Sequence, residues 1–152
     1  MDISKHLPPE HITLDIKSNL KFDVIEELLS LLDENKQLLN KEVTLKDLLA
    51  REGYLSTGLE KGLAVPHAKS DGVDQLLIAM GIKKDGLDFE SLDGKPAQVI
   101  FLVLSPRDTS GPHIQSLATI SRNYKSDEIR QALLNAKTPE AVAEIIKEQF
   151  TQ

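Results

Sequence analysis

Residues 97–104 read Ala97-Gln98-Val99-Ile100-Phe101-Leu102-Val103-Leu104, a run that is apolar at every position except Gln98. A second run of the same kind, Leu76-Leu77-Ile78-Ala79-Met80-Gly81-Ile82, precedes it in the chain. Strands that are covered on both faces of a sheet have this nearly continuous apolar character. Both segments are therefore predicted to be central strands, with a turn between them at Asp93-Gly94 and Lys95-Pro96.

The segments before these runs carry weaker strand and helix signals. Apolar and polar residues alternate over residues 11–16, which predicts an early strand, and Leu63-Ala64-Val65 predicts a short one. Apolar residues at helical spacing predict a helix that begins near Asp23, where Asp23 and Glu26 resemble a capping box. Thr44 is predicted to cap a second helix.

Further helices are predicted after the last strand, over residues 113–123, 127–136 and 140–148. Ser126 is the predicted cap of the middle helix, and Pro139 occupies the favoured first position of the final one. Helices before and after a group of strands predict a three-layer α/β sandwich. Its central mixed sheet is expected to have about five strands, with helices on both faces.

The composition is that of an ordinary globular protein with a modest negative charge. Of the 152 residues, 40% are hydrophobic and 28% are charged, and this length suits one domain over residues 1–152. The formal net charge of −6 argues against a nucleic-acid partner, because proteins that bind phosphate backbones are basic. The chain has no cysteine, no signal-peptide pattern and no run of about 18 apolar residues, so a cytoplasmic protein is expected.

The tripeptide Val65-Pro66-His67 is the strongest candidate for a chemical site. Pro66 fixes its own φ and favours an extended Val65, which places the imidazole at the end of a short strand on a constrained backbone. A histidine is mostly neutral near pH 7, so its lone pair is a competent nucleophile toward phosphorus. Arg51 and His113 are candidates for holding phosphate oxygens, through a guanidinium fork and a ring N–H. Taken alone, each of the three has a plainer interpretation as a loop or helix-end residue.

The residues around His67 carry a resemblance to a known family. The segment Ser56-Thr57-Gly58-Leu59-Glu60-Lys61-Gly62-Leu63-Ala64-Val65-Pro66-His67-Ala68 resembles the type-2 enzyme IIA domain of the bacterial phosphotransferase system, the fructose, mannitol and nitrogen-regulatory class. Arg51 and His113 match the arginine and the second histidine of that family in type and order. Residues 86–96 and 134–140 are also similar to this family, whereas Glu60 departs from it, because glycine is common there.

The resemblance implies a phosphocarrier. His67 would accept a phosphoryl group from phospho-HPr on Nε2 and pass it to a IIB partner, which bears a cysteine in sugar-transporting systems. Arg51 and His113 would hold the phosphoryl oxygens. Ser56 and Thr57 are further candidates for phosphate contacts, although turn hydroxyls also satisfy nearby backbone groups. The relay implies no cofactor and no metal ion, and a link to the membrane only indirectly, through a IIC permease.

Two functions fit this resemblance. Residues 86–96 favour the fructose branch of sugar uptake, and the alternative is a nitrogen-type regulatory IIA protein that controls target proteins by phosphorylation-dependent binding. The intact set of Arg51, His67 and His113 argues against an interaction module without relay activity. A hydrolase that uses His67 as a base lacks a plausible nucleophile partner. An apolar docking rim around His67 has three candidates, which are alternatively core residues: Leu55, Leu59 and Leu63.

Overall fold

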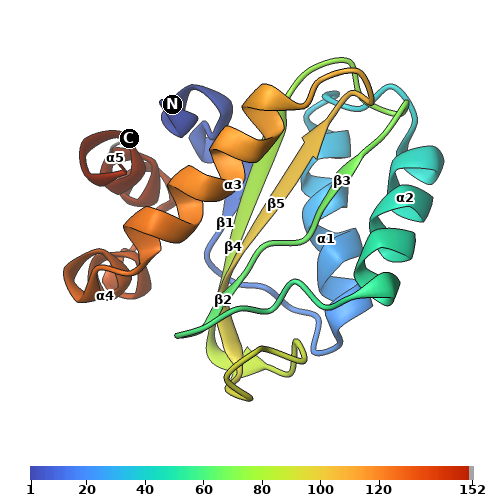
Figure 1. The fold of residues 1–152 in the computed structure, drawn as a ribbon. Coiled ribbons are helices and arrows are strands. Elements are labelled where there is room, and N and C mark those ends of the chain that lie inside the picture. The colour runs from blue at the N-terminus through green and yellow to red at the C-terminus, as the bar shows by residue number, and fades with distance from the viewer. Residues whose placement is uncertain (151–152) are drawn as a thin grey trace.

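The computed structural model describes residues 1–150, in which a five-stranded sheet lies between layers of helices (Figure 1). The strands are β1 (Ile12–Thr13), β2 (Leu63–Ala64), β3 (His67–Lys69), β4 (Leu77–Leu87) and β5 (Ala97–Ser105). The helices are η1 (Ile3–His6), η2 (Pro9–His11), α1 (Lys21–Glu34), α2 (Lys41–Tyr54), α3 (Gly111–Tyr124), α4 (Asp127–Asn135) and α5 (Pro139–Gln149). No helix in residues 1–150 has the length and apolar character that crossing a membrane requires.

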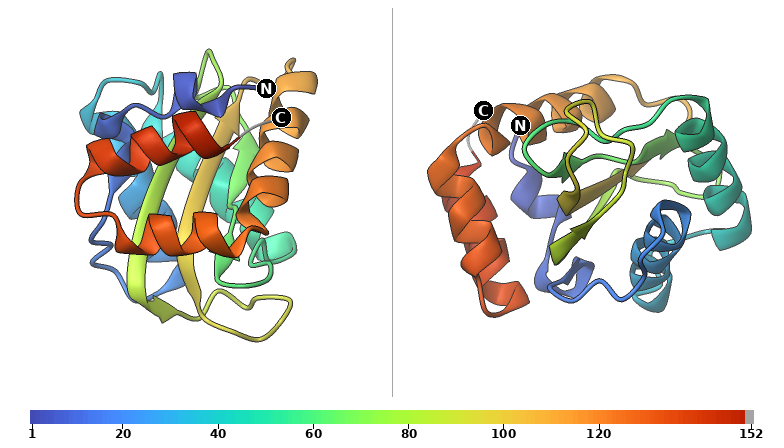
Figure 2. Two further views of the ribbon diagram at one scale, coloured as in Figure 1. Left: turned by 90° about the vertical axis from the view of Figure 1, so that its left-hand side faces the viewer. Right: turned by 90° about the horizontal axis from the view of Figure 1, so that it is seen from below.

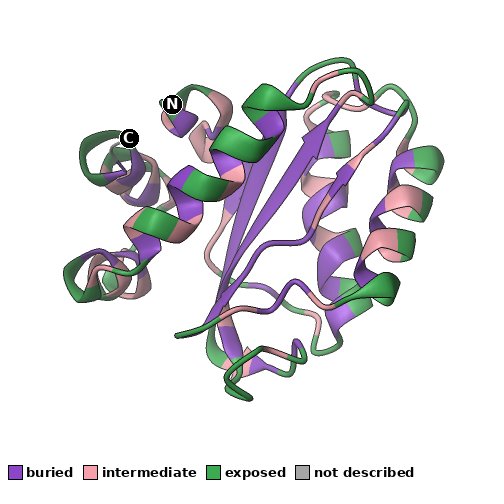
Figure 3. Cartoon of the chain, viewed as in Figure 1, coloured by how far each residue is buried: buried purple, intermediate pink, exposed green. Residues whose placement is uncertain are grey.

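The two apolar runs form the centre of the sheet, as predicted. The strand order is β1-β4-β5-β2, and β3 pairs with β5 beyond the end of β2. β4 and β5 are antiparallel, with Ala79 opposite Leu102, and the other strand pairs are parallel. Figure 3 shows both long strands buried along most of their length. The sheet is therefore mixed, with its most apolar strands in the middle.

Helices cover both faces of this sheet. α1 and α2 lie on one face, and α3, α4 and α5 lie on the other (Figure 2). Alternate side chains of β5 enter the two cores because successive residues of a strand point to opposite faces. Phe101 packs with residues of α3, α4 and α5, whereas Leu102 packs with residues of α1 and α2. The predicted three-layer α/β sandwich is confirmed.

The predicted capping box at the start of α1 is wrong. The helix begins at Lys21 with Leu20 as its N-cap, and no side chain caps it, so Asp23 lies within the first turn. The start of α1 is held instead by a tertiary contact, because Nζ of Lys21 lies 3.2 Å from Oε2 of Glu52 in α2. A partner from another helix is invisible to a local sequence pattern.

The predicted cap of α2 is also wrong. Asn40 is the N-cap, and its side chain accepts a hydrogen bond of 3.1 Å from the N–H of Val43. Thr44 lies inside the helix, where its hydroxyl donates to the carbonyl of Asn40 at 2.7 Å. Asparagine is as good a cap as threonine, and it stands one helical turn earlier. The predicted cap of α4 is confirmed, since Ser126 accepts from the N–H of Ile129, and Pro139 is the first residue of α5, as predicted.

The early strand is shorter than predicted. Only Ile12 and Thr13 form strand pairs with β4. His11 belongs to a 3-10 turn that begins at Pro9, and Ile16, beyond the strand, donates its N–H to the carbonyl of Ile82 at 3.2 Å. His11 is buried, and its Nδ1 lies 3.0 Å from the carbonyl of Ile78, so this ring anchors the turn to the sheet. The predicted strand at residues 63–65 is β2, but His67 does not follow its end directly. His67 opens the next strand, β3.

Candidate functional site

The backbone around His67 is tied on both sides. Val103 of β5 donates its N–H to the carbonyl of Pro66 at 3.0 Å, and His67 lies opposite Val103 in the parallel β3–β5 pair. The N–H of Val65 donates to the carbonyl of Thr57 at 3.1 Å. The backbone that carries His67 is therefore fixed both to the sheet and to the preceding loop.

One nitrogen of the His67 ring is committed to the backbone. Nδ1 lies 2.8 Å from the carbonyl oxygen of Val65, which is only an acceptor, so Nδ1 carries the hydrogen of the neutral ring. Nε2 is then the nitrogen with the free lone pair. Burial lowers the pKa of His67 below its usual range against the opposing effect of the Val65 carbonyl, and the charge of Arg51 lowers this pKa further. The ring is therefore neutral, and nucleophilic at Nε2, near pH 7.

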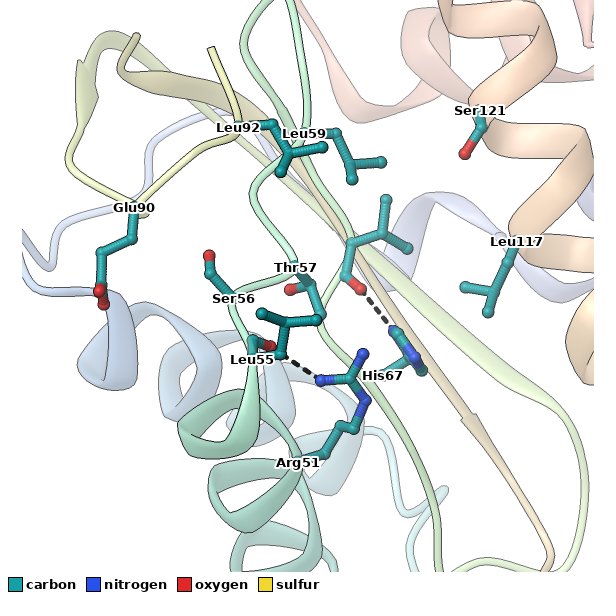
Figure 4. Close-up of a pocket in the computed structure, with 11 residues that line it drawn as sticks. Arg51, Leu55, Ser56, Thr57, Leu59, His67, Glu90, Leu92, Leu117 and Ser121 are labelled. Atoms are coloured by element: carbon teal, nitrogen blue, oxygen red, sulfur yellow. Dashed lines mark hydrogen bonds between the residues drawn. The ribbon is translucent and has the colours of Figure 1, made fainter. Parts of the chain in front are cut away.

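Arg51 and His67 line one cavity of about 370 Å³, shown in Figure 4. Arg51 comes from the last turn of α2, and its Nη1 donates to the carbonyl of Leu55 at 2.8 Å, which orients the guanidinium. The cavity also has a largely apolar wall, which consists of Leu55, Leu59, Val65, Leu92 and Leu117. A cationic fork beside a neutral imidazole, in an apolar recess, suits a small anionic group.

Two apolar side chains of this wall are strongly exposed. Leu55 is 64% exposed and Leu92 is 76% exposed, so both remain available to a partner. Of the other rim candidates, Leu59 is partly buried, whereas Leu63 is only 3% exposed and belongs to the core. The docking interpretation therefore fits Leu55 and excludes Leu63.

His113 lies against His67. It comes from the first turn of α3 and is 6% exposed, and the centroids of the two rings are 5.6 Å apart in an edge-on arrangement. His113 is not among the residues that line the cavity, but its ring lies beside that of His67. Burial lowers the pKa of His113 to about 4, with smaller contributions from His67 and Lys69, so this ring is neutral near pH 7.

Comparison with known proteins identifies the family of this chain. The family described as "Phosphoenolpyruvate-dependent sugar phosphotransferase system, EIIA 2" matches residues 5–149. The chain belongs to this family. It is a IIA domain, and its relatives include both sugar-specific and nitrogen-regulatory proteins.

Three relatives illustrate this range. The IIA domain is 36% identical to the PTS system fructose-specific EIIABC component of Bacillus subtilis, and the match covers 97% of this chain and 23% of that protein. It is 34% identical to the PTS system fructose-specific EIIA component of Haloferax volcanii, over 97% of this chain and 96% of that protein. Among solved structures, it is similar to the nitrogen regulatory protein IIA-Ntr from Neisseria meningitidis. That similarity has a TM-score of 0.87 and 33% identity, and covers 95% of this chain and 98% of that one.

The hydroxyls of Ser56 and Thr57 are occupied within the IIA domain. Ser56 donates to the carbonyl of Phe89 at 2.5 Å, and Thr57 donates to Oε1 of Glu52 at 2.5 Å. Both residues line the cavity, but Thr57 is only 4% exposed. In this arrangement the two hydroxyls fix the loop before His67, and a contact of either one with phosphate stays a prediction.

Sequence reasoning missed a buried ion pair beneath the site. Glu52 is 2% exposed and pairs with Lys21, which also donates to Oε1 of Glu90 at 2.8 Å. Burial acts to lower the pKa of Lys21, but the bond to Glu90 and the charge of Glu52 outweigh it and raise this pKa. The only sequence signal is that Glu52 follows Leu48 at helical spacing, on the buried face of α2.

Proposed function

We propose that this IIA domain is a cytoplasmic phosphocarrier, in which His67 accepts a phosphoryl group from phospho-HPr. The observation that carries the proposal is the bond between Nδ1 of His67 and the carbonyl of Val65. This bond assigns the lone pair to Nε2 in a ring that lines the cavity beside Arg51. A neutral imidazole needs no helper base to attack phosphorus, so the ring and a cationic neighbour are sufficient for this chemistry.

The transfer is an in-line exchange between two nitrogens. The lone pair on Nε2 of His67 forms a bond to phosphorus as the bond between phosphorus and the donor histidine breaks, and that electron pair returns to the donor ring. Arg51 binds the phosphoryl oxygens through its guanidinium, and His113 donates one ring N–H to them. Positioning and charge stabilisation supply most of the catalysis in such a transfer.

The acceptor is a IIB protein or domain of a fructose-type system. A cysteine thiolate of IIB attacks phosphorus, and the electron pair of the broken bond returns to Nε2 of His67. The Bacillus subtilis relative supports this partner, because its name joins A, B and C components, and the IIC permease provides the link to the membrane. The exposed Leu55 and Leu92 beside the cavity offer both partners an apolar docking surface.

A second candidate is a nitrogen-type regulatory role, in which phosphorylation of His67 controls the binding of target proteins. Its support is the similarity to IIA-Ntr from Neisseria meningitidis, at 33% identity over 95% of this chain. Incubation of the phosphorylated protein with a fructose-specific IIB separates the two roles. Transfer to the IIB cysteine supports sugar uptake, whereas phosphate retained on His67 supports regulation.

The decisive test is labelling from phosphoenolpyruvate, Enzyme I and HPr. The wild-type protein should acquire acid-labile, base-stable phosphate, and His67→Ala should acquire none. His6→Ala is the matched control, because His6 lies in η1 and does not line the cavity, and this variant should label like the wild type. Full labelling of His67→Ala, or an unlabelled wild type, would contradict the proposal.

A further inference from the structure

A buried serine lies beside the second histidine. Ser105 is the last residue of β5 and has no exposed surface, and its Oγ lies 2.5 Å from Nδ1 of His113. The site chemistry described above uses His113 but not Ser105. Because β3 pairs with the end of β5, Ser105 belongs to the strand that also supports His67.

The direction of this hydrogen bond follows from the surroundings of Ser105. Within residues 1–150, its hydroxyl has no other hydrogen-bond partner than Nδ1 of His113. If Nδ1 carried the hydrogen, the hydroxyl would accept it, and the serine hydrogen would be buried without an acceptor. An unsatisfied buried donor is costly, so the serine donates and Nδ1 of His113 accepts.

The tautomer of His113 follows from this direction. A neutral imidazole carries one hydrogen, so a ring that accepts at Nδ1 carries that hydrogen on Nε2. The lowered pKa of His113, about 4, keeps the ring neutral near pH 7, so only one of its two nitrogens carries a hydrogen. The bonds of the two site histidines are therefore opposite: Nδ1 of His67 donates to a carbonyl, and Nδ1 of His113 accepts from a hydroxyl.

We propose that Ser105 is a positioning residue that holds His113 as the Nε2–H tautomer, so that this N–H is available to the phosphoryl group on His67. The inference rests on the proposed function, since it deepens the role of His113 in that transfer. His67 needs a lone pair on Nε2, whereas its neighbour needs a hydrogen there. The Val65 carbonyl and the Ser105 hydroxyl impose these opposite states on two rings whose centroids are 5.6 Å apart.

Ser105 is not itself a nucleophile in this arrangement. A hydroxyl that is bonded to an imidazole resembles the activated serine of a hydrolase. A nucleophile must be reached by its substrate, however, and Ser105 is fully buried and does not line the cavity with His67. Its hydroxyl can act only through His113.

The tautomer is measured directly by two-bond 1H–15N correlation spectra of the histidine rings near pH 7. We expect His113 of the wild type to be the Nε2–H form, and Ser105→Ala to show a measurable population of the Nδ1–H form. A wild-type His113 with its hydrogen on Nδ1, or an unchanged tautomer in Ser105→Ala, overturns the proposal. Even if Ser105→Ala folds poorly, the tautomer of His113 in the wild type still tests the proposal.

Single-turnover transfer from phospho-HPr measures how the tautomer of His113 affects the rate of phosphoryl transfer. Ser105→Ala should lower the rate constant about tenfold without changing the affinity for HPr, because one oriented hydrogen bond is weakened in the transfer step. Ser116→Ala is the matched control, because Ser116 is equally buried and its hydroxyl donates to the backbone carbonyl of His113 rather than to its ring. Equal rate constants for transfer in Ser105→Ala and Ser116→Ala would refute the role of Ser105 in phosphoryl transfer. A wild type that accepts no phosphate refutes the proposed function, and the spectra still decide the tautomer.

Discussion

Both carboxylate oxygens of Glu52 bind Thr57: Oε1 accepts from its hydroxyl at 2.5 Å and Oε2 accepts from its backbone N–H at 2.8 Å. The carbonyl of Thr57 accepts from Val65, and the carbonyl of Val65 accepts from Nδ1 of His67. A buried carboxylate of α2 thus reaches the His67 ring through two backbone carbonyls. The carboxylate also pairs with Lys21, so this chain of bonds joins α1, α2 and β3.

Replacing Glu52 should therefore destabilise the protein strongly. We expect Glu52→Ala to lower the free energy of unfolding by about 3 kcal/mol, because it leaves Lys21 and Thr57 without their buried partner. Glu90→Ala is the control, because Glu90 is the other partner of Lys21 but its side chain is 70% exposed. Its loss should cost less than about 1 kcal/mol. Urea unfolding measures the free energy of unfolding of both variants. Similar losses in Glu52→Ala and Glu90→Ala would contradict this role of Glu52.

Acidification should destabilise the protein through His113. Its pKa is about 4 in the folded state, against an ordinary value of 6.5, so between these pH values the unfolded chain binds the extra proton. The free energy of unfolding should then fall as the pH falls from 6.5 to about 4, by at most about 3 kcal/mol. Urea unfolding at about pH 7 and about pH 4.5 tests this in the wild type and in His113→Gln.

The variant should lose less stability over this range than the wild type. Some loss should remain, because burial also lowers the pKa of His67, with the same sign. Stability is present above the unfolded pKa of each histidine and is lost as the pH falls toward the folded pKa. An equal loss in the wild type and in His113→Gln would show that His113 does not titrate in this way.

Alanine at two glycines should have opposite effects. A Cβ on Gly58 would lie 2.7 Å from Oγ of Ser91 and 2.8 Å from the carbonyl oxygen of Phe89, so the loop before His67 would have to move. We expect Gly58→Ala to destabilise the protein by about 2 kcal/mol. Gly53 lies in α2 with no atom within 4 Å of such a Cβ, so Gly53→Ala should stabilise it by about 0.5 kcal/mol. Thermal unfolding compares the two, and shifts of the same sign would refute the argument.

The central strands and the later helices could be predicted because their signals are local. A continuous apolar run is a property of the segment itself. β5 lies where its run predicts it, whereas β4 begins within its run at Leu77 and extends beyond it to Leu87. Ser126 caps α4 from the adjacent position in the chain, so a short pattern contains the whole interaction. A local pattern did not predict the start of α1 correctly, because Lys21 is held by side chains from α2 and from the loop after β4.

Some residues of the site could be predicted from the sequence and others could not, because the latter depend on contacts between distant segments. The family resemblance pointed to Arg51, His67 and His113, and the fold brings Arg51 and His67 to one cavity, with His113 against His67. The roles of all three remain proposals. Glu52 and Ser105 have no sequence signal of comparable strength, because a single Glu or Ser in a helix or strand is ordinary without its partner.

The amino-acid order alone determined the two central strands and the approximate positions of helices α1 to α5, and it placed a histidine behind a proline on a constrained backbone. Only the tertiary structure decided which nitrogen of each ring carries the hydrogen. That choice depends on a carbonyl beside His67 and on a hydroxyl beside His113. A hydrogen bond forms only when its donor and acceptor meet at the right distance and angle, and for the Ser105 hydroxyl and the His113 ring the packing of α3 against β5 sets both.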